Sequence, residues 1–147
     1  MTIWILPFEE VSRTNGFTAA QDRYDEELGK QVPDGHFIVL AAKRIPPHPA
    51  MTRYLVAHEY GHAVEDWIWQ RRGDTDHGSA LKAEYSRMRR LPEVANYGGG
   101  TWHRSPNEVM ACDFRLTIAG VESEFWPHPG ISRPGKAVRR WWERHRG

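Results

Sequence analysis

The apolar positions in the first third of the chain predict two strands separated by a helix. The apolar run at Thr2–Leu6 predicts a strand that Pro7 ends, and Phe37–Lys43 predicts a second, mostly apolar strand. Between them, the polar stretch TAAQDRYDEELGKQ at residues 18–31 predicts a helix. The Pro-Asp-Gly that follows this stretch predicts a turn.

The rest of the chain has the apolar spacing of helices. The longest predicted helix begins near Thr52, after a rigid proline-rich connector at residues 46–49, and ends before Gly73. Further helices are predicted at residues 79–91 and at residues 105–120. The basic tail KAVRRWWERHR predicts a short terminal helix.

The composition is that of an ordinary globular protein. The chain has 147 residues, a net charge of +1 with neutral histidines, 39% hydrophobic residues and 27% charged residues. This small net charge provides no general attraction to nucleic acid or to a membrane. The sequence has neither a signal peptide pattern nor an apolar run long enough to span a membrane. We therefore expect one cytoplasmic α+β domain over residues 1–147, with a small sheet packed on the longest helix.

Candidate chemistry lies in that helix, within the stretch YLVAHEYGHAVEDW. Residues four apart on a helix differ by about 40° after a full turn, so His58 and His62 project side by side. This spacing lets two imidazole nitrogens reach one metal ion at roughly 2.0–2.1 Å. Glu59 is turned by about 100° from His58, so it flanks the ion without binding it. The pattern is the H-E-x-x-H metal-binding arrangement.

Two alternatives apply to this motif. The histidines could be two ordinary residues of a helix face that hold no metal. The step from Glu59 to His62 also has the E-x-x-H spacing of di-iron bundles, but those bundles need a second such step, which the sequence lacks. The single cysteine, Cys112, excludes an intrachain disulfide and a cysteine-rich zinc site.

A zinc site of this kind needs a third protein ligand. Glu65 lies two turns from His58 and therefore does not share its ion. We predict Glu108, because its helix face includes the small residues Ala111 and Cys112 and would pack closely on the histidine helix. The residues downstream of His62 that could supply this third ligand are His77, Glu84, His103, Glu108, Asp113 and His128.

Other interpretations of these residues remain open from the sequence. Ser105 and Glu108 have the spacing of a capping box, in which the glutamate would bond back to the start of its own helix. Cys112 is expected to be a small buried residue and not a thiolate ligand. Asp113 points away from Glu108, so we expect it either at the surface or as a group that contacts a metal ligand without binding the ion.

The stretches HEYGHAVEDW and NEVMACDF together resemble the gluzincins, the class of zinc metallopeptidases that contains thermolysin. The pattern Glu108-x-x-Ala111-x-x-Phe114 is more specifically similar to the ligand helix of the ImmA/IrrE family and of minimal single-domain gluzincins. The resemblance covers about residues 36–120. It implies a compact zincin-like fold and a metallopeptidase that hydrolyses peptide or protein substrates.

The resemblance also implies a role for each motif residue. His58, His62 and Glu108 would bind Zn²⁺, and Glu59 would be the catalytic residue, acting as general base and then general acid on a metal-activated water. Thermolysin-like enzymes place an aspartate four residues after the glutamate ligand, where it orients a zinc histidine. Here that position is Cys112, so we expect the histidine to be oriented from elsewhere.

Two further expectations concern the substrate. Tyr97, His103 and His128 are candidates to stabilise the oxyanion. The strand at Phe37–Lys43 would align an extended peptide if it lay at the edge of the sheet.

The alternative function is a latent or non-catalytic zinc-binding domain that acts as a protein or nucleic-acid interaction module. The basic tail with Trp141 and Trp142 would serve it, but we expect these tryptophans to pack back on the domain and nucleic acid not to be a partner.

Overall fold

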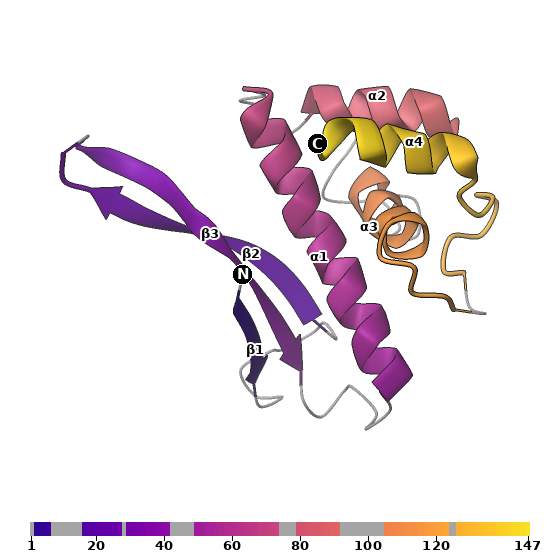
Figure 1. Ribbon diagram of the computed structural model, residues 1–147, viewed down its shortest axis with the longest axis horizontal. Coiled ribbons are helices and arrows are strands. Elements are labelled where there is room, and N and C mark those ends of the chain that lie inside the picture. The colour runs from indigo at the N-terminus through magenta and orange to yellow at the C-terminus, as the bar shows by residue number, and fades with distance from the viewer. Residues whose placement is uncertain are drawn as a thin grey trace.

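The computed structural model shows an α+β fold in which one long helix lies between a small sheet and three further helices (Figure 1). It describes residues 2–6, 16–27, 29–41, 49–73, 79–91, 105–123 and 126–147. The elements within these ranges are β1 (Thr2–Leu6), β2 (Gly16–Asp25), β3 (Lys30–Ala41), α1 (Pro49–Arg71), α2 (Ser79–Arg89), α3 (Pro106–Thr117) and α4 (Lys136–His145). The α+β prediction is therefore confirmed.

The sheet has the strand order β1-β3-β2, with β3 parallel to β1 and antiparallel to β2. The predicted strand Thr2–Leu6 is confirmed and pairs with β3 from Phe37 to Ala41. Because β3 is the central strand, both of its edges are paired along this stretch. The expectation that Phe37–Lys43 aligns a peptide as an edge strand is therefore wrong, and Ala42 and Lys43 lie outside the described residues.

The helix predicted at residues 18–31 is wrong, because this stretch forms β2, a turn and the start of β3. Gly29 takes a positive φ of 62° in the turn that joins the two strands. The local composition favours a helix, but pairing with the buried residues Ile38, Val39 and Leu40 of β3 outweighs that preference.

The Pro-Asp-Gly turn predicted after residue 31 is also wrong, because it lies inside β3. Strand pairing passes from Gln21 opposite Gly35 to Asp22 opposite Pro33, so Asp34 is an extra residue that forms a β-bulge. Gly35 has a φ of 128° there. A bulge is one of the few places where a strand accepts proline.

Helix α1 carries the H-E-x-x-H motif and confirms the strongest sequence prediction. It begins at Pro49, three residues before the predicted start at Thr52. Proline fits the first turn because its missing N–H would have no partner in the helix. The helix ends at Arg71, and Gly73 follows with a φ of 64°, as its stop signal predicts. No helix in the described ranges is long and apolar enough to cross a membrane.

The helical half of the molecule is held by an aromatic core. Leu81 and Tyr85 of α2 are fully buried, as the spacing of this helix predicts. Trp141 packs against Tyr85 with ring centroids 4.8 Å apart, and Trp142 packs against Phe114 at 5.1 Å. The tryptophans of the tail therefore pack back on the domain, as expected.

Asp113 is fully buried between α2 and α3, so the expectation of a surface position is wrong. The Tyr85 hydroxyl donates a hydrogen bond to its carboxylate, and Arg89 Nε lies 2.7 Å from Asp113 Oδ2. The side chain of Arg89 is only 6% exposed, so this is a buried ion pair.

We predict that Asp113→Asn lowers the free energy of unfolding by about 3–5 kcal/mol, because it leaves the buried Arg89 charge without its partner. The matched control is Glu143→Gln, which removes a carboxylate that pairs with Arg139 on the exposed face of α4. The control should cost less than about 1 kcal/mol. Urea unfolding measures the free energy of unfolding of both variants. Equal losses would contradict a larger contribution from the buried ion pair.

Candidate metal centre

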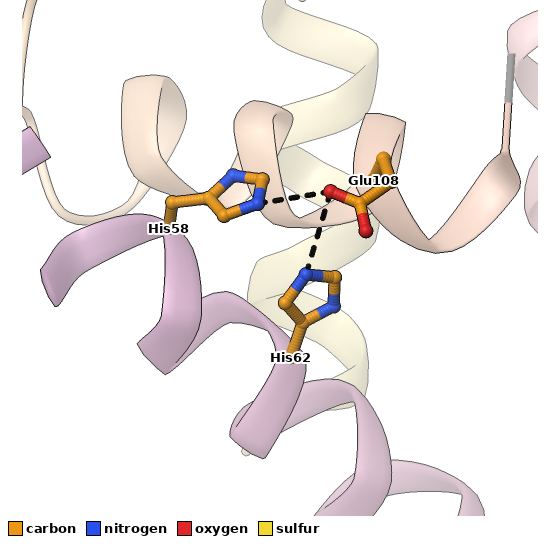
Figure 2. A group of neighbouring side chains, drawn as sticks. All are labelled: His58, His62 and Glu108. Atoms are coloured by element: carbon orange, nitrogen blue, oxygen red, sulfur yellow. Dashed lines mark hydrogen bonds and ion pairs between the residues drawn. The ribbon is translucent and has the colours of Figure 1, made fainter. Parts of the chain in front are cut away.

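Helices α1 and α3 bring together the three residues that the sequence analysis proposes as metal ligands. The ligand atoms of His58, His62 and Glu108 all lie within 4.8 Å of one another (Figure 2). Glu108 Oε2 is 3.0 Å from His58 Nε2 and 3.7 Å from His62 Nε2. Among the described residues, this is the group of histidine, cysteine and acidic side chains that could hold a metal ion.

The spacing of these atoms fits a metal ion. Two ligand atoms bound at roughly 2.0–2.1 Å in a tetrahedral site are about 3.4 Å apart. The distances of 3.0 and 3.7 Å from Glu108 to the two histidines lie on either side of this value. Two imidazole nitrogens and one carboxylate oxygen are also a donor set of metal sites that keep one position open.

The two helices reach this distance because they pack closely at a glycine. A Cβ atom at Gly61, within the H-E-x-x-H motif, would lie 2.8 Å from Ala111 Cα and 3.0 Å from Ala111 O. Any larger residue at position 61 would therefore push the backbone of α3 away. The small face predicted for α3 is thus the face that contacts α1.

The capping box proposed for the start of α3 does not form. Ser105 is the N-cap residue, but its side chain makes no capping hydrogen bond. The Glu108 carboxylate is instead directed at the two histidines (Figure 2).

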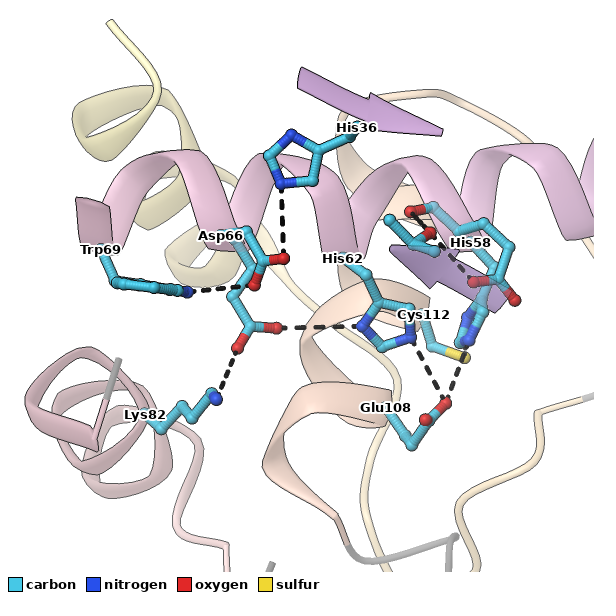
Figure 3. A network of polar contacts seen from close by, with 11 residues as sticks. His36, His58, His62, Asp66, Trp69, Lys82, Glu108 and Cys112 are labelled. Carbon is cyan, nitrogen blue, oxygen red and sulfur yellow. Dashed lines mark hydrogen bonds and ion pairs between the residues drawn. The ribbon is translucent and has the colours of Figure 1, made fainter. Parts of the chain in front are cut away.

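A second side chain contacts the outer nitrogen of each histidine (Figure 3). Cys112 Sγ lies 3.3 Å from His58 Nδ1, and Glu65 Oε2 lies 4.0 Å from His62 Nδ1. The expectation that His58 is oriented from elsewhere in the chain is therefore wrong, because Cys112 itself occupies that place. Metal-binding histidines commonly have such a partner on the nitrogen that does not bind the ion.

Cys112 is a buried thiol and not a ligand of the same ion. It is 0% exposed, and burial raises the pKa of its thiol to about 12. Its sulfur faces Nδ1 of His58, whereas Nε2 faces Glu108. Tyr54 stacks on the His58 ring with an interplanar angle of 9° and further restricts its orientation.

The contacts in this group shift the pKa values of Glu108 and His62. Burial alone would raise the pKa of Glu108, but hydrogen bonds from His58 and His62 outweigh it and lower the pKa to about 2. Burial alone would lower the pKa of His62, but Glu108 and Glu65 outweigh it and raise the pKa to about 10. Without metal, His62 is therefore an imidazolium between two carboxylates at neutral pH, and a metal ion must displace its proton.

Glu59 lies beside the three clustered residues and is not one of them. Its side chain is largely buried on the side of α1 that faces β2. The Thr18 hydroxyl lies 2.6 Å from the Glu59 carbonyl oxygen and 3.1 Å from Glu59 Oε2. Both oxygens are within reach of its single proton as hydrogen-bond acceptors. The role of Thr18 cannot be predicted from the sequence, because the local pattern at residues 18–31 indicates a helix.

The other candidates among the described residues do not join this group. Glu84 accepts hydrogen bonds from Arg72 and from Trp141 of α4. His128 is fully buried with its ring against Trp126. Three further candidates lie outside the described residues, namely His77, Tyr97 and His103.

Two hollows lie beside α1, away from the motif side chains. One of about 780 Å³ is lined in part by Val56 and Tyr60, and one of about 570 Å³ by Tyr60 and Trp67. None of the motif residues His58, Glu59 and His62 lines either hollow. The converging donor atoms therefore locate the candidate site, because polar donors and not apolar volume bind a metal ion.

Comparison of the chain with protein-family models, curated proteins and solved structures found no match. A function must therefore be inferred from the motif and from the geometry of the site.

We predict that Gly61→Ala lowers both stability and metal affinity. Overpacking costs about 1–3 kcal/mol, which exceeds the gain of up to about 1 kcal/mol from better helix propensity. Because the nearest atoms belong to the Ala111 backbone, adding Ala111→Gly should not rescue the variant. Urea unfolding and zinc titration measure the two effects, and wild-type values in both would contradict the role of this contact.

We also predict a pH dependence for the metal-free protein. A folded-state pKa raised from 6.5 to about 10 makes His62 stabilising below pH 6.5, and this contribution is lost as the pH rises toward 10. The stability difference between wild type and His62→Gln should therefore be largest near pH 6 and shrink by pH 10. Urea unfolding in the presence of a chelator tests this, and a difference that does not change with pH would contradict it.

Proposed function

We propose that this protein is a zinc-dependent metallopeptidase with a compact zincin-like fold of the gluzincin type. The observation that carries the proposal is the convergence of His58, His62 and Glu108, in which the H-E-x-x-H helix supplies two donors and a second helix supplies the third. The position of Glu59 next to this group, outside the ligand set, supports its role as the catalytic carboxylate.

Each residue would have one task in the hydrolysis of a peptide bond. A zinc ion, when bound, supplies Lewis acidity that polarises a carbonyl and lowers the pKa of water. Glu59 takes a proton from the attacking water and passes it to the leaving amine. The Thr18 hydroxyl holds Oε2 of Glu59 and so limits the orientations of this carboxylate.

The edge of the sheet near Glu59 would align the substrate. Among the described strands, β2 pairs with β3 alone, and its residue Thr18 contacts Glu59. An extended peptide that adds to this edge through backbone hydrogen bonds would pass close to the catalytic carboxylate. In this proposal β2 takes the aligning role that the sequence analysis assigns to β3.

The burial of Glu59 favours a second candidate, a latent or non-catalytic zinc-binding domain. Glu59 is 6% exposed, so water and substrate have little access to it in this structure. In such a domain the metal stabilises the fold, and a protein or nucleic-acid partner would bind elsewhere.

We predict that Glu59→Gln retains zinc and loses hydrolysis by about 10²–10⁴-fold, because the amide cannot accept the proton. Glu108→Gln should instead lose zinc as well as activity. Zinc content is measured by atomic spectroscopy, and cleavage of a mixed peptide library by mass spectrometry. Glu143→Gln, an exposed change on α4, is the control for both.

The outcomes separate the two candidates. Zinc-loaded wild type that leaves the library intact would support the latent or non-catalytic domain and contradict the peptidase. Full zinc content in Glu108→Gln would contradict the metal centre itself.

A further inference from the structure

A buried carboxylate lies on the far side of the His62 ring from the candidate metal position. Glu65 follows His62 by one helical turn and is only 2% exposed. Its Oε2 is 4.0 Å from His62 Nδ1. His62 Nε2 faces Glu108 on the other side of the ring (Figure 3). The imidazole therefore lies between two carboxylates that come from different helices.

The second oxygen of Glu65 meets a lysine from α2. Lys82 Nζ lies 3.4 Å from Glu65 Oε1, and the Lys82 side chain is 8% exposed (Figure 3). Burying two opposite charges costs several kcal/mol per ion in lost hydration. Apolar residues of similar volume often give equal or greater stability than such a pair. Stability alone therefore does not account for a carboxylate and an ammonium at these positions.

We propose that Glu65 is the positioning residue for His62 and that Lys82 holds and neutralises Glu65. This inference rests on the proposed metal centre. In this role Glu65 accepts a hydrogen bond from the Nδ1–H of His62, which fixes the tautomer that directs the Nε2 lone pair toward the ion. The contact of 4.0 Å is an ion-pair distance and is too long for a hydrogen bond, so the proposed role requires the two groups to move closer when Nε2 binds metal.

The two histidines are then held in chemically different ways. His58 has a neutral thiol at Nδ1, and a thiol sulfur is a weak hydrogen-bond acceptor. His62 has the Glu65 carboxylate there, and a carboxylate oxygen is a stronger acceptor than a thiol sulfur. The proposed attachment of His62 therefore depends on α2, which contributes no ligand of its own to the clustered group.

The adjacent carboxylate, Asp66, provides a matched control. Its oxygens contact Trp69 Nε1 at 3.0 Å and His36 Nε2 at 3.4 Å (Figure 3). It lies on the same helix and carries the same charge as Glu65, but neither of these partners is a proposed ligand.

The test measures binding of Co²⁺ alone, by competition with a chelator, in wild type, Glu65→Gln and Asp66→Asn. Proton NMR of the Co²⁺ form also resolves the ring N–H of each bound histidine. We expect Glu65→Gln to weaken Co²⁺ binding about 10–100-fold and to shift the N–H signal of His62 while that of His58 stays in place. Asp66→Asn should match wild type in both measurements.

Two further variants separate the site from the fold. Lys82→Met leaves the Glu65 charge buried without its partner and should destabilise the protein. Adding Glu65→Gln to it should restore stability in urea unfolding, while Co²⁺ binding stays as weak as in Glu65→Gln alone.

Wild-type Co²⁺ affinity and an unshifted His62 signal in Glu65→Gln would overturn the positioning role. Wild-type protein that binds no Co²⁺ would overturn the metal centre and this role together. Wild-type protein that binds Co²⁺ but cleaves no peptide would contradict only the peptidase.

Discussion

The candidate site depends on the close approach of α1 and α3. Gly61 on α1 faces Ala111 on α3 with no space for a Cβ atom between them. At this separation the short side chain of Glu108 reaches both histidines, at 3.0 and 3.7 Å. Helix axes usually lie about 8–10 Å apart, depending on the side chains at the contact. A glycine inside the histidine motif therefore serves the geometry of the site as well as the packing of the core.

Helix α1 has a different neighbour on each of its functional sides. Toward the sheet, Glu59 is held by Thr18 of β2, and toward α3, His58 contacts Glu108 and Cys112. Toward α2, Glu65 lies beside the His62 ring, and Lys82 of α2 lies next to Glu65. Side chains whose orientations are fixed from several directions lose less freedom when they bind a ligand, so such a site is preorganised.

The helices α1 to α4 and the grouping of His58, His62 and Glu108 follow from local spacing, which the sequence displays directly. The i, i+4 histidines and the small face around Glu108 identify residues that the fold brings together. The strand β2 is missed because pairing with a distant strand determines it, and the contact of Thr18 is lost with it. Ser105 is the N-cap residue of α3, but the capping box expected from the sequence does not form, because the Glu108 carboxylate faces the histidines. The role of Lys82 also depends on a tertiary contact that no local pattern indicates.

X-ray absorption at the zinc edge tests the central claim most directly, because it reports the atoms that surround the ion. Two imidazoles and the Glu108 carboxylate predict nitrogen and oxygen neighbours at about 2.0–2.1 Å, with the outer-shell pattern of two histidine rings and no sulfur. Cys112 is the only cysteine in the chain. A sulfur neighbour at about 2.3 Å, or the outer-shell pattern of fewer than two histidines, would contradict this account.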